Sequence, residues 1–278
     1  MSQRHFGVLA GDQWRAQKFL CVGLDTEHQV AAEAIGQEVP DVQFSFNREI
    51  VDATHDLVGA YKLNSAFYEA CGVDGIVALR ATIAYIRDMA PNVPVIVDAK
   101  RADIGNTNSA SCEFIFDYLG ADAVTVHPYL GRDALEPFLA REDRGIFVLC
   151  RTSNPGADEF QDLRVGNGVP LFEVIAQHVT NSWNMRGNCG LVVGATYPSE
   201  LEKVRSLAPT LPLLVPGVGA QGGDLEAAVR NGLAKTGGRL FVNSSRAIIF
   251  ASMRGFRDAA RSAAKSYDSA IRMAAKVL

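Results

Sequence analysis

The stretch Val93-Pro94-Val95-Ile96-Val97-Asp98-Ala99-Lys100 contains the pattern that decides the fold. It is a short apolar run, rich in β-branched residues, that ends in charged ones. Such a run is typical of a strand in a parallel sheet, because these strands are buried on both faces. The preceding segment, Val73–Met89, carries apolar residues at helical spacing, namely Ile76, Leu79, Ile83 and Ile86. Together the two segments predict a helix followed by a buried parallel strand.

Seven further runs of this kind occur along the chain, separated by stretches long enough to form crossover helices. The eight runs are Phe19–Leu24, Val58–Leu63, Val93–Val97, Ala123–Val126, Gly145–Leu149, Gly190–Val193, Pro212–Val215 and Arg239–Val242. Eight strand–helix units in about 250 residues are typical of a TIM barrel. The predicted fold class is therefore α/β, a single (β/α)8 TIM barrel over residues 1–278. The alternative is an open doubly wound sheet.

Composition narrows the class of protein. The 278 residues include 27 Lys or Arg and 31 Asp or Glu, so the formal net charge is −4, and 48% of residues are hydrophobic. This mildly acidic chain lacks the basic surface that a general nucleic-acid binder needs, so no nucleic-acid partner is expected. No apolar run approaches the roughly 18 residues that span a bilayer, and no signal peptide is evident. We therefore expect a cytoplasmic globular protein with no membrane partner.

Charged residues occur at the predicted strand ends where a barrel places its active site. Asp25 comes after the first run, Lys62 lies in the second, and Asp98, Lys100 and Asp103 follow the third. Asp98 and Lys100 are two residues apart, so both are expected on one side of the sheet, while Asp103 is already in the loop.

The spacing of these charges bears on the role of Lys100. A lysine held between carboxylates has its ammonium form favoured, so the pKa of Lys100 is expected to rise. A Schiff-base lysine needs a lowered pKa instead. The spacing therefore favours Lys100 as a proton donor or cation. The alternative interpretation is that these charged residues form a structural ion-pair network in the barrel mouth.

Two polar segments follow the last two predicted strands. Pro216–Asp224 contains Gly217, Gly219 and Gly222, and Asn243-Ser244-Ser245-Arg246 adds hydroxyl groups and a guanidinium. Glycines let backbone N–H groups approach an anion, and TIM barrels bind phosphate at these two loops. The glycines also fit G-x-G-x-x-G, but about 20 residues on stands Asn243 rather than an acid. A phosphate site is therefore predicted rather than a dinucleotide site.

The least regular segment is Thr152–Gly168, which is predicted to be a surface loop or lid. Thr152-Ser153-Asn154 at its start either hydrogen-bonds a planar ring or forms an ordinary turn. The His, Cys and Asp residues of the chain show no metal-ligand spacing, so no metal is expected.

Two motifs together resemble orotidine 5'-phosphate decarboxylase, in the longer bacterial branch of that family. They are Asp98-Ala99-Lys100 followed by Asp103-Ile104-Gly105-Asn106-Thr107, and Pro216-Gly217-Val218-Gly219-Ala220-Gln221-Gly222-Gly223. The resemblance runs from about Phe19 to Ala251. It implies a homodimeric (β/α)8 barrel that converts orotidine 5'-monophosphate (OMP) to uridine 5'-monophosphate (UMP) in de novo pyrimidine synthesis. It also implies that no metal or cofactor takes part.

The resemblance implies roles for individual residues. Asp25 and Lys62 would contact the ribose hydroxyls and the other charged residues of the site. Asp98 would stand against the substrate carboxylate, and Lys100 would protonate C6. The second subunit would contribute Asp103, Ile104 and Thr107. Ser153 would contact the pyrimidine, and the phosphate ligands would be Gln221, Ser245 and Arg246. Ser245 stands where a glycine commonly donates its backbone N–H.

The charged residues also fit this chemistry independently of the family resemblance. Loss of CO2 from C6 leaves a carbanion without an electron sink, and the sequence shows no PLP or TPP machinery. An ammonium beside C6 can stabilise the carbanion and deliver the proton. Three alternatives stay open: a magnesium-dependent sugar-phosphate decarboxylase or aldolase-type relative on the same barrel, a Schiff-base aldolase, and a non-catalytic phospho-ligand-binding protein.

Overall fold

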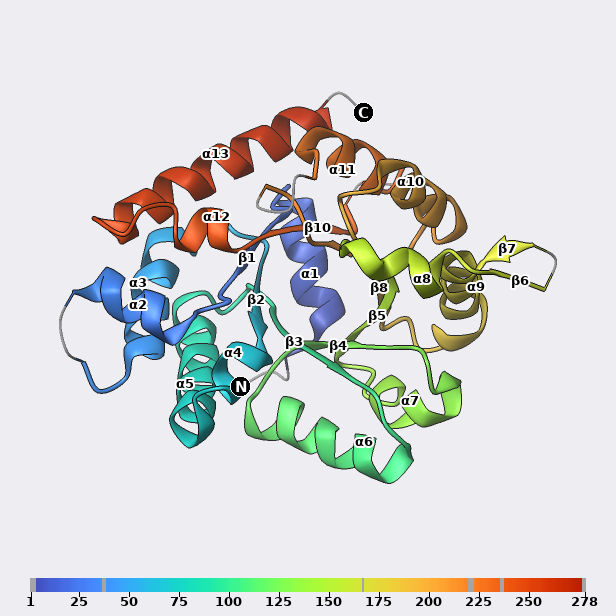
Figure 1. The fold of residues 1–278 in the computed structure, drawn as a ribbon, viewed down its shortest axis with the longest axis horizontal. Coiled ribbons are helices and arrows are strands. Elements are labelled where there is room, and N and C mark those ends of the chain that lie inside the picture. Colours follow the sequence, from blue (N-terminus) through green and yellow to red (C-terminus); the bar gives the residue numbers. More distant parts are fainter. Residues whose placement is uncertain (1–3, 37–38, 167, 220–222, 236–237, 277–278) are drawn as a thin grey trace.

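The computed structural model of the chain describes residues 4–36, 39–166, 168–219, 223–235 and 238–276. Parallel strands close into a barrel in the order β1-β10-β9-β8-β5-β4-β3-β2 (Figure 1). Their bounds are β1 (Leu20–Gly23), β2 (Ala60–Asn64), β3 (Val95–Arg101), β4 (Ala123–Val126), β5 (Gly145–Arg151), β8 (Cys189–Val193), β9 (Leu213–Val215) and β10 (Leu240–Ser244). All eight predicted runs form strands. The predicted barrel is therefore confirmed, and the open sheet is wrong.

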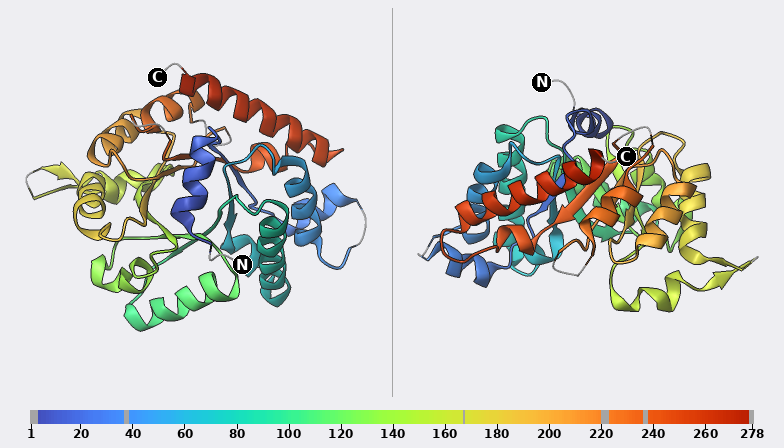
Figure 2. Two further views of the ribbon diagram at one scale, coloured as in Figure 1. Left: turned by 180° about the vertical axis from the view of Figure 1, so that it is seen from behind. Right: turned by 90° about the horizontal axis from the view of Figure 1, so that it is seen from above.

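Helices occupy the connections and surround the barrel (Figures 1 and 2). They are α2 (His28–Ile35), α3 (Val42–Thr54), α4 (Ser65–Glu69), α5 (Gly72–Met89), α6 (Gly105–Cys112), η1 (Glu113–Tyr118), α7 (Gly131–Leu139), α9 (Leu171–His178), η3 (Val179–Trp183), α10 (Pro198–Leu207), α11 (Leu225–Gly232), α12 (Arg246–Ile249) and α13 (Phe256–Lys276). The predicted helix Val73–Met89 is α5, whose Ile83 and Ile86 are fully buried. In the part of the chain that the structure describes, no helix has the length and apolar character needed to cross a membrane.

An N-terminal helix that was not predicted from the sequence, α1 (Phe6–Arg15), closes one end of the barrel. Phe6 and Ala10 are buried among the inward-facing strand residues, and the Phe6 ring packs edge-on against Phe147 at 5.6 Å. Arg4, just before α1, pairs with Asp122 at the start of β4. Figure 2 shows α1 lying across the barrel in the view from behind. A ligand must therefore enter at the carboxyl ends of the strands.

Alternation along the strands decides which side chains reach this open end. Ile96 of β3 and Ala123 of β4 belong to the fully buried interior of the barrel. Successive side chains of a strand point to opposite faces. Asp98 and Thr125, two positions further on, therefore also point inward, but closer to the carboxyl ends. The barrel thus has an apolar floor and a polar mouth.

The segment after β5 is more ordered than predicted. Within Thr152–Gly168 lie the short helical turns η2 (Pro155–Ala157) and α8 (Asp158–Gln161). A two-stranded antiparallel sheet follows, formed by β6 (Arg164–Val165) and β7 (Val169–Pro170). Figure 1 shows this small sheet extending outward from the barrel beside α9. The segment lies at the surface, as predicted. Its short helical turns and strands were not predicted, because they are too short to leave a periodic pattern in the sequence.

Candidate active site

Four charged side chains from three neighbouring strands meet at the open end of the barrel. Asp25 follows β1, Lys62 belongs to β2, and Asp98 and Lys100 belong to β3. The Lys62 ammonium lies 3.3 Å from Asp25 Oδ1 and 3.1 Å from Asp98 Oδ2. The Lys100 ammonium lies 2.8 Å from Asp98 Oδ1. We call these four residues the charge array, since carboxylates and ammonium groups alternate along it.

The array holds its two most buried members in their charged forms. Burial alone would lower the pKa of Lys62, but the carboxylates of Asp25 and Asp98 outweigh it and raise that pKa above its usual range. Burial alone would raise the pKa of Asp98, but Lys62, Lys100 and the hydrogen bonds to it lower that pKa below its usual range. Both groups are therefore ionised at neutral pH, so the field at the mouth is in place before any ligand binds.

The two lysines of the array have different surroundings. The lysine held between two carboxylates of this chain is Lys62, whereas among the described residues Lys100 pairs only with the carboxylate of Asp98. Within the part of the chain that the structure describes, the predicted second carboxylate, Asp103, forms no ion pair with Lys100. The Lys100 side chain is 47% exposed, against 5% for Lys62. Of the two ammonium groups, that of Lys100 is thus the more accessible to a ligand in the mouth.

Thr125, which was not among the predicted site residues, joins the array from β4. The pairing of β3 with β4 shifts between Val97 and Arg101, so β3 bulges opposite Thr125. Within this bulge Lys100 has a φ of +46°, a left-handed conformation that non-glycine residues rarely adopt. The Lys100 backbone N–H donates to Thr125 Oγ1 at 3.0 Å, and that hydroxyl donates to Asp98 Oδ1 at 2.7 Å. The sequence did contain a signal for Thr125, namely a hydroxyl side chain at an inward-facing position of an otherwise apolar strand.

The structure does not bring Asp103, Ile104 and Thr107 into the array. All three side chains are exposed, and Ile104 is 60% exposed. Asn108 fixes the backbone of this loop, because its Oδ1 accepts from the Asp103 N–H at 2.9 Å and its Nδ2 donates to Asp103 O at 2.6 Å. Among the residues that the structure describes, no ion pair joins Asp103 to the array. The loop thus presents these three side chains at the surface.

The predicted phosphate residues follow β9 and β10. Gly217 and Gly219 have φ values of +94° and +81°, which glycine adopts without strain. The Gly223 N–H donates to Gly217 O at 3.1 Å. Arg246 begins α12 and is exposed. Gln221, another predicted phosphate ligand, lies outside the described residues.

Ser245 lies against Gly23, where β10 meets β1. A Cβ on Gly23 would stand 1.9 Å from Ser245 Oγ and 2.8 Å from Ser245 Cβ. Asn243 Nδ2 donates to the same hydroxyl at 3.3 Å. Because Gly23 has no side chain, the loop after β10 has room for a serine at position 245.

We expect Gly23→Ala to destabilise the protein, because the added methyl group must displace Ser245. Overpacking of this kind typically costs ~1–3 kcal/mol, so the thermal unfolding midpoint should fall. The double variant Gly23→Ala/Ser245→Gly removes the clash and should unfold close to the parent temperature. A Gly23→Ala midpoint equal to that of the parent would contradict this close approach.

The loop that carries Ser153 is anchored by a buried arginine that the sequence did not reveal. Arg151 ends β5, is 1% exposed, and pairs through Nε with Asp162 Oδ1 at 3.1 Å. Its guanidinium also lies over the Tyr197 ring, 4.2 Å from the centroid. Ser153 lies two residues further on, with its backbone against Gly194, just after β8. The Arg151 pair is non-local, so no local motif marks it, yet it fixes the start of the predicted pyrimidine loop.

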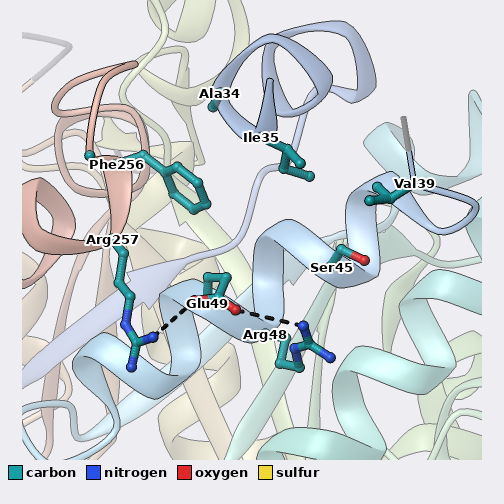
Figure 3. A pocket seen from close by; sticks show the side chains of 9 residues that line it. Ala34, Ile35, Val39, Ser45, Arg48, Glu49, Phe256 and Arg257 are labelled. Carbon is teal, nitrogen blue, oxygen red and sulfur yellow. Dashed lines mark hydrogen bonds and ion pairs between the residues drawn. The ribbon is translucent and has the colours of Figure 1, made fainter. Parts of the chain in front are cut away.

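A pocket lies on the outside of the barrel. Its volume is about 350 Å³, and it lies between α2, α3 and the start of α13 (Figure 3). Glu49 there lies 3.1 Å from Arg257 and 3.6 Å from Arg48, so the charges of this pocket pair with one another. None of the charge array lines it. Over the described ranges, no group of three or more His, Cys, Asp or Glu side chains could hold a metal ion.

Comparison with known proteins gives consistent matches. The model of the orotidine 5'-phosphate decarboxylase / HUMPS family matches residues 18–261. The orotidine 5'-phosphate decarboxylase of Roseiflexus castenholzii is 49% identical over 267 residues, which cover 95% of this chain and 96% of the relative. The solved OMP decarboxylase of Leishmania donovani is 36% identical, with a TM-score of 0.85 and coverage of 98% and 99%. The UMP synthase of that organism has a TM-score of 0.88 and 38% identity, but this chain spans only 57% of its length.

Proposed function

The chain belongs to the orotidine 5'-phosphate decarboxylase / HUMPS family, and we propose that it removes CO2 from OMP to give UMP in pyrimidine synthesis in the cytoplasm. The observation that carries this proposal is the charge array in the mouth of a barrel closed at its other end. Asp98 is held ionised by Lys62, and the partly exposed ammonium of Lys100 lies beside it. The proposal is tested by incubating the chain with OMP, which should yield UMP and CO2 in equal amounts.

The proposed reaction uses Lys100 at C6 of the pyrimidine. When the bond from C6 to the carboxylate breaks, CO2 leaves and the electron pair stays on C6. The Lys100 ammonium stabilises this charge and then transfers a proton to C6. Asp98 keeps the ammonium in place through the 2.8 Å contact, and it faces the substrate carboxylate. No step of this sequence draws on a metal or a cofactor.

The remaining residues would hold the two ends of the nucleotide. Asp25 and Lys62, linked at 3.3 Å, would bind the ribose hydroxyls at the edge of the array. Ser153 would contact the pyrimidine from the loop that Arg151 anchors. The predicted phosphate ligands are Gln221, Ser245 and Arg246. A phosphate held far from C6 can contribute binding energy to the reaction as well as to affinity.

We further propose that the protein acts as a homodimer in which each site is completed by its neighbour. Among the described residues, Asp103 forms no ion pair with the charge array of its own chain, and Lys100 pairs with one carboxylate, that of Asp98. Asp103, Ile104 and Thr107 are exposed directly after β3, as a contribution in trans requires. In a two-fold dimer each loop would complete the other site. Asp103 of the partner subunit would then supply the second carboxylate beside Lys100.

Arg246→Ala should weaken the hold on the phosphate. Loss of one charge-assisted hydrogen bond lowers kcat/KM by roughly 10- to 150-fold. Orotidine, which lacks the phosphate, should be turned over almost equally by the variant and the parent. Steady-state kinetics on both substrates check this. Equal losses on the two substrates would show that Arg246 acts elsewhere.

A further inference from the structure

One hydroxyl group connects the two β3 residues that the proposed reaction uses. Thr125 is 1% exposed, and its Oγ1 donates to Asp98 Oδ1 at 2.7 Å while it accepts from the Lys100 backbone N–H at 3.0 Å. A threonine hydroxyl has a single proton. If it rotates to another acceptor, the bond to Asp98 is lost. The two bonds therefore fix Thr125, Asp98 and the Lys100 backbone relative to one another.

The contact to the Lys100 backbone lies where β3 is least regular. The bulge between Val97 and Arg101 interrupts the pairing with β4. Its left-handed residue, Lys100, is disfavoured by roughly 1–2 kcal/mol relative to ordinary backbone. Bulges commonly re-aim a side chain next to an active site. Here the bulge lets Lys100 and Asp98 meet through their side chains at 2.8 Å.

The hydroxyl is not needed to keep Asp98 ionised. That carboxylate already contacts two ammonium groups, those of Lys62 and Lys100. By contrast, Thr125 Oγ1 is the partner of the Lys100 N–H, since the regular pairing with β4 resumes only at Arg101. Removing the hydroxyl leaves that N–H to find another partner. The left-handed conformation then loses the bond that holds it.

We propose that Thr125 is a positioning residue, whose hydroxyl holds Lys100 in its left-handed conformation and so aims the Lys100 ammonium at C6. This inference rests on the proposed role of Lys100 as proton donor. It assigns to β4 a part in the reaction, although no Thr125 atom needs to touch the reacting carbon. It also separates placing the ammonium, which depends on Thr125, from holding the nucleotide, which depends on the ribose and phosphate ligands.

The test compares Thr125→Val, which removes the hydroxyl but keeps the branched shape, with Thr125→Ser, which keeps the hydroxyl. The kcat of Thr125→Val for OMP should fall by roughly 10- to 150-fold, the effect of one lost hydrogen bond to a charged group. KM should stay within about threefold, and Thr125→Ser should recover kcat to within about threefold. A kcat of Thr125→Val within twofold of the parent would overturn the proposal.

Thr54→Val is the matched control. Thr54 is also fully buried, and its hydroxyl also makes two hydrogen bonds, to Ile50 O and to the Tyr61 hydroxyl, each at 2.7 Å. It lies in α3, outside the array. Thr54→Val should lower the unfolding temperature but leave kcat unchanged. A similar fall in kcat for both valine variants would mean that Thr125 acts only through stability, and would overturn the positioning role.

A crystal structure of Thr125→Val decides the question without relying on turnover. Lys100 should leave the left-handed region, and its ammonium should lose the contact with Asp98. An unchanged Lys100 backbone with the ammonium still on Asp98 would overturn the proposal. If the parent does not convert OMP, the proposed function fails, and this structure still shows whether Thr125 holds Lys100.

Discussion

Lys100→Ala is expected to lose turnover of OMP almost completely while the protein stays folded and still binds UMP. General acid catalysis contributes roughly 10²–10⁴-fold and a preorganised charge roughly 10²–10³-fold. Since Lys100 would supply both, kcat should fall by about 10⁴-fold or more. Its side chain is 47% exposed at the mouth and outside the apolar core, so its removal leaves the packing intact.

Three measurements make this expectation specific. Circular dichroism and thermal unfolding should show a folded variant, and titration with UMP should show retained affinity. Lys203→Ala is the matched control, because Lys203 is also a half-exposed lysine paired with one carboxylate, Glu173, and it lies outside the array. That control should turn over OMP like the parent. Near-parent turnover by folded Lys100→Ala would eliminate its role as proton donor.

Mixed dimers of two inactive variants are expected to regain activity. Lys100→Ala removes the ammonium of one array, and Asp103→Ala removes the carboxylate that the loop offers to the neighbouring site. After the two are unfolded and refolded together, about half of the dimers should be mixed. Each mixed dimer has one site with Lys100 from one chain and Asp103 from the other. Activity should recover to about a quarter of the parent value per site.

The matched control combines Lys100→Ala with Lys62→Ala. Both lysines contact Asp98 within one chain, so mixing these variants restores no complete array. This pair should stay inactive, as should each variant refolded alone. If the Lys100→Ala and Asp103→Ala mixture stays inactive although mass spectrometry of the intact dimers proves mixing, Asp103 acts within its own chain or not at all.

The barrel could be predicted from the sequence because its strands are buried on both faces. Such strands need near-continuous apolar runs, and Val93–Val97 and Ala123–Val126 meet this need without help from distant residues. The charges at their carboxyl ends were visible for the same reason, since an apolar strand has no structural need for Asp98 or Lys100. Fold and array therefore follow from local pattern together with one rule about where barrels place their sites.

The features that escaped prediction depend on contacts between distant segments. Nothing near Phe6 shows that it will pack on Phe147 and close the barrel floor. Arg151 is paired with Asp162 across a loop. The bulge in β3 exists only relative to β4, so neither the left-handed Lys100 nor its bond to Thr125 can be read from one strand alone.

The most direct test of the central claim, that this charge array decarboxylates OMP without a metal, is one absorbance trace. The purified chain is added to OMP in EDTA, and the orotidine absorbance is followed. The account predicts a fall to the absorbance of UMP, at the same rate in EDTA as with added Mg²⁺. An absorbance that stays constant in EDTA and falls only when Mg²⁺ is supplied would contradict the claim and favour a metal-dependent relative on the same barrel.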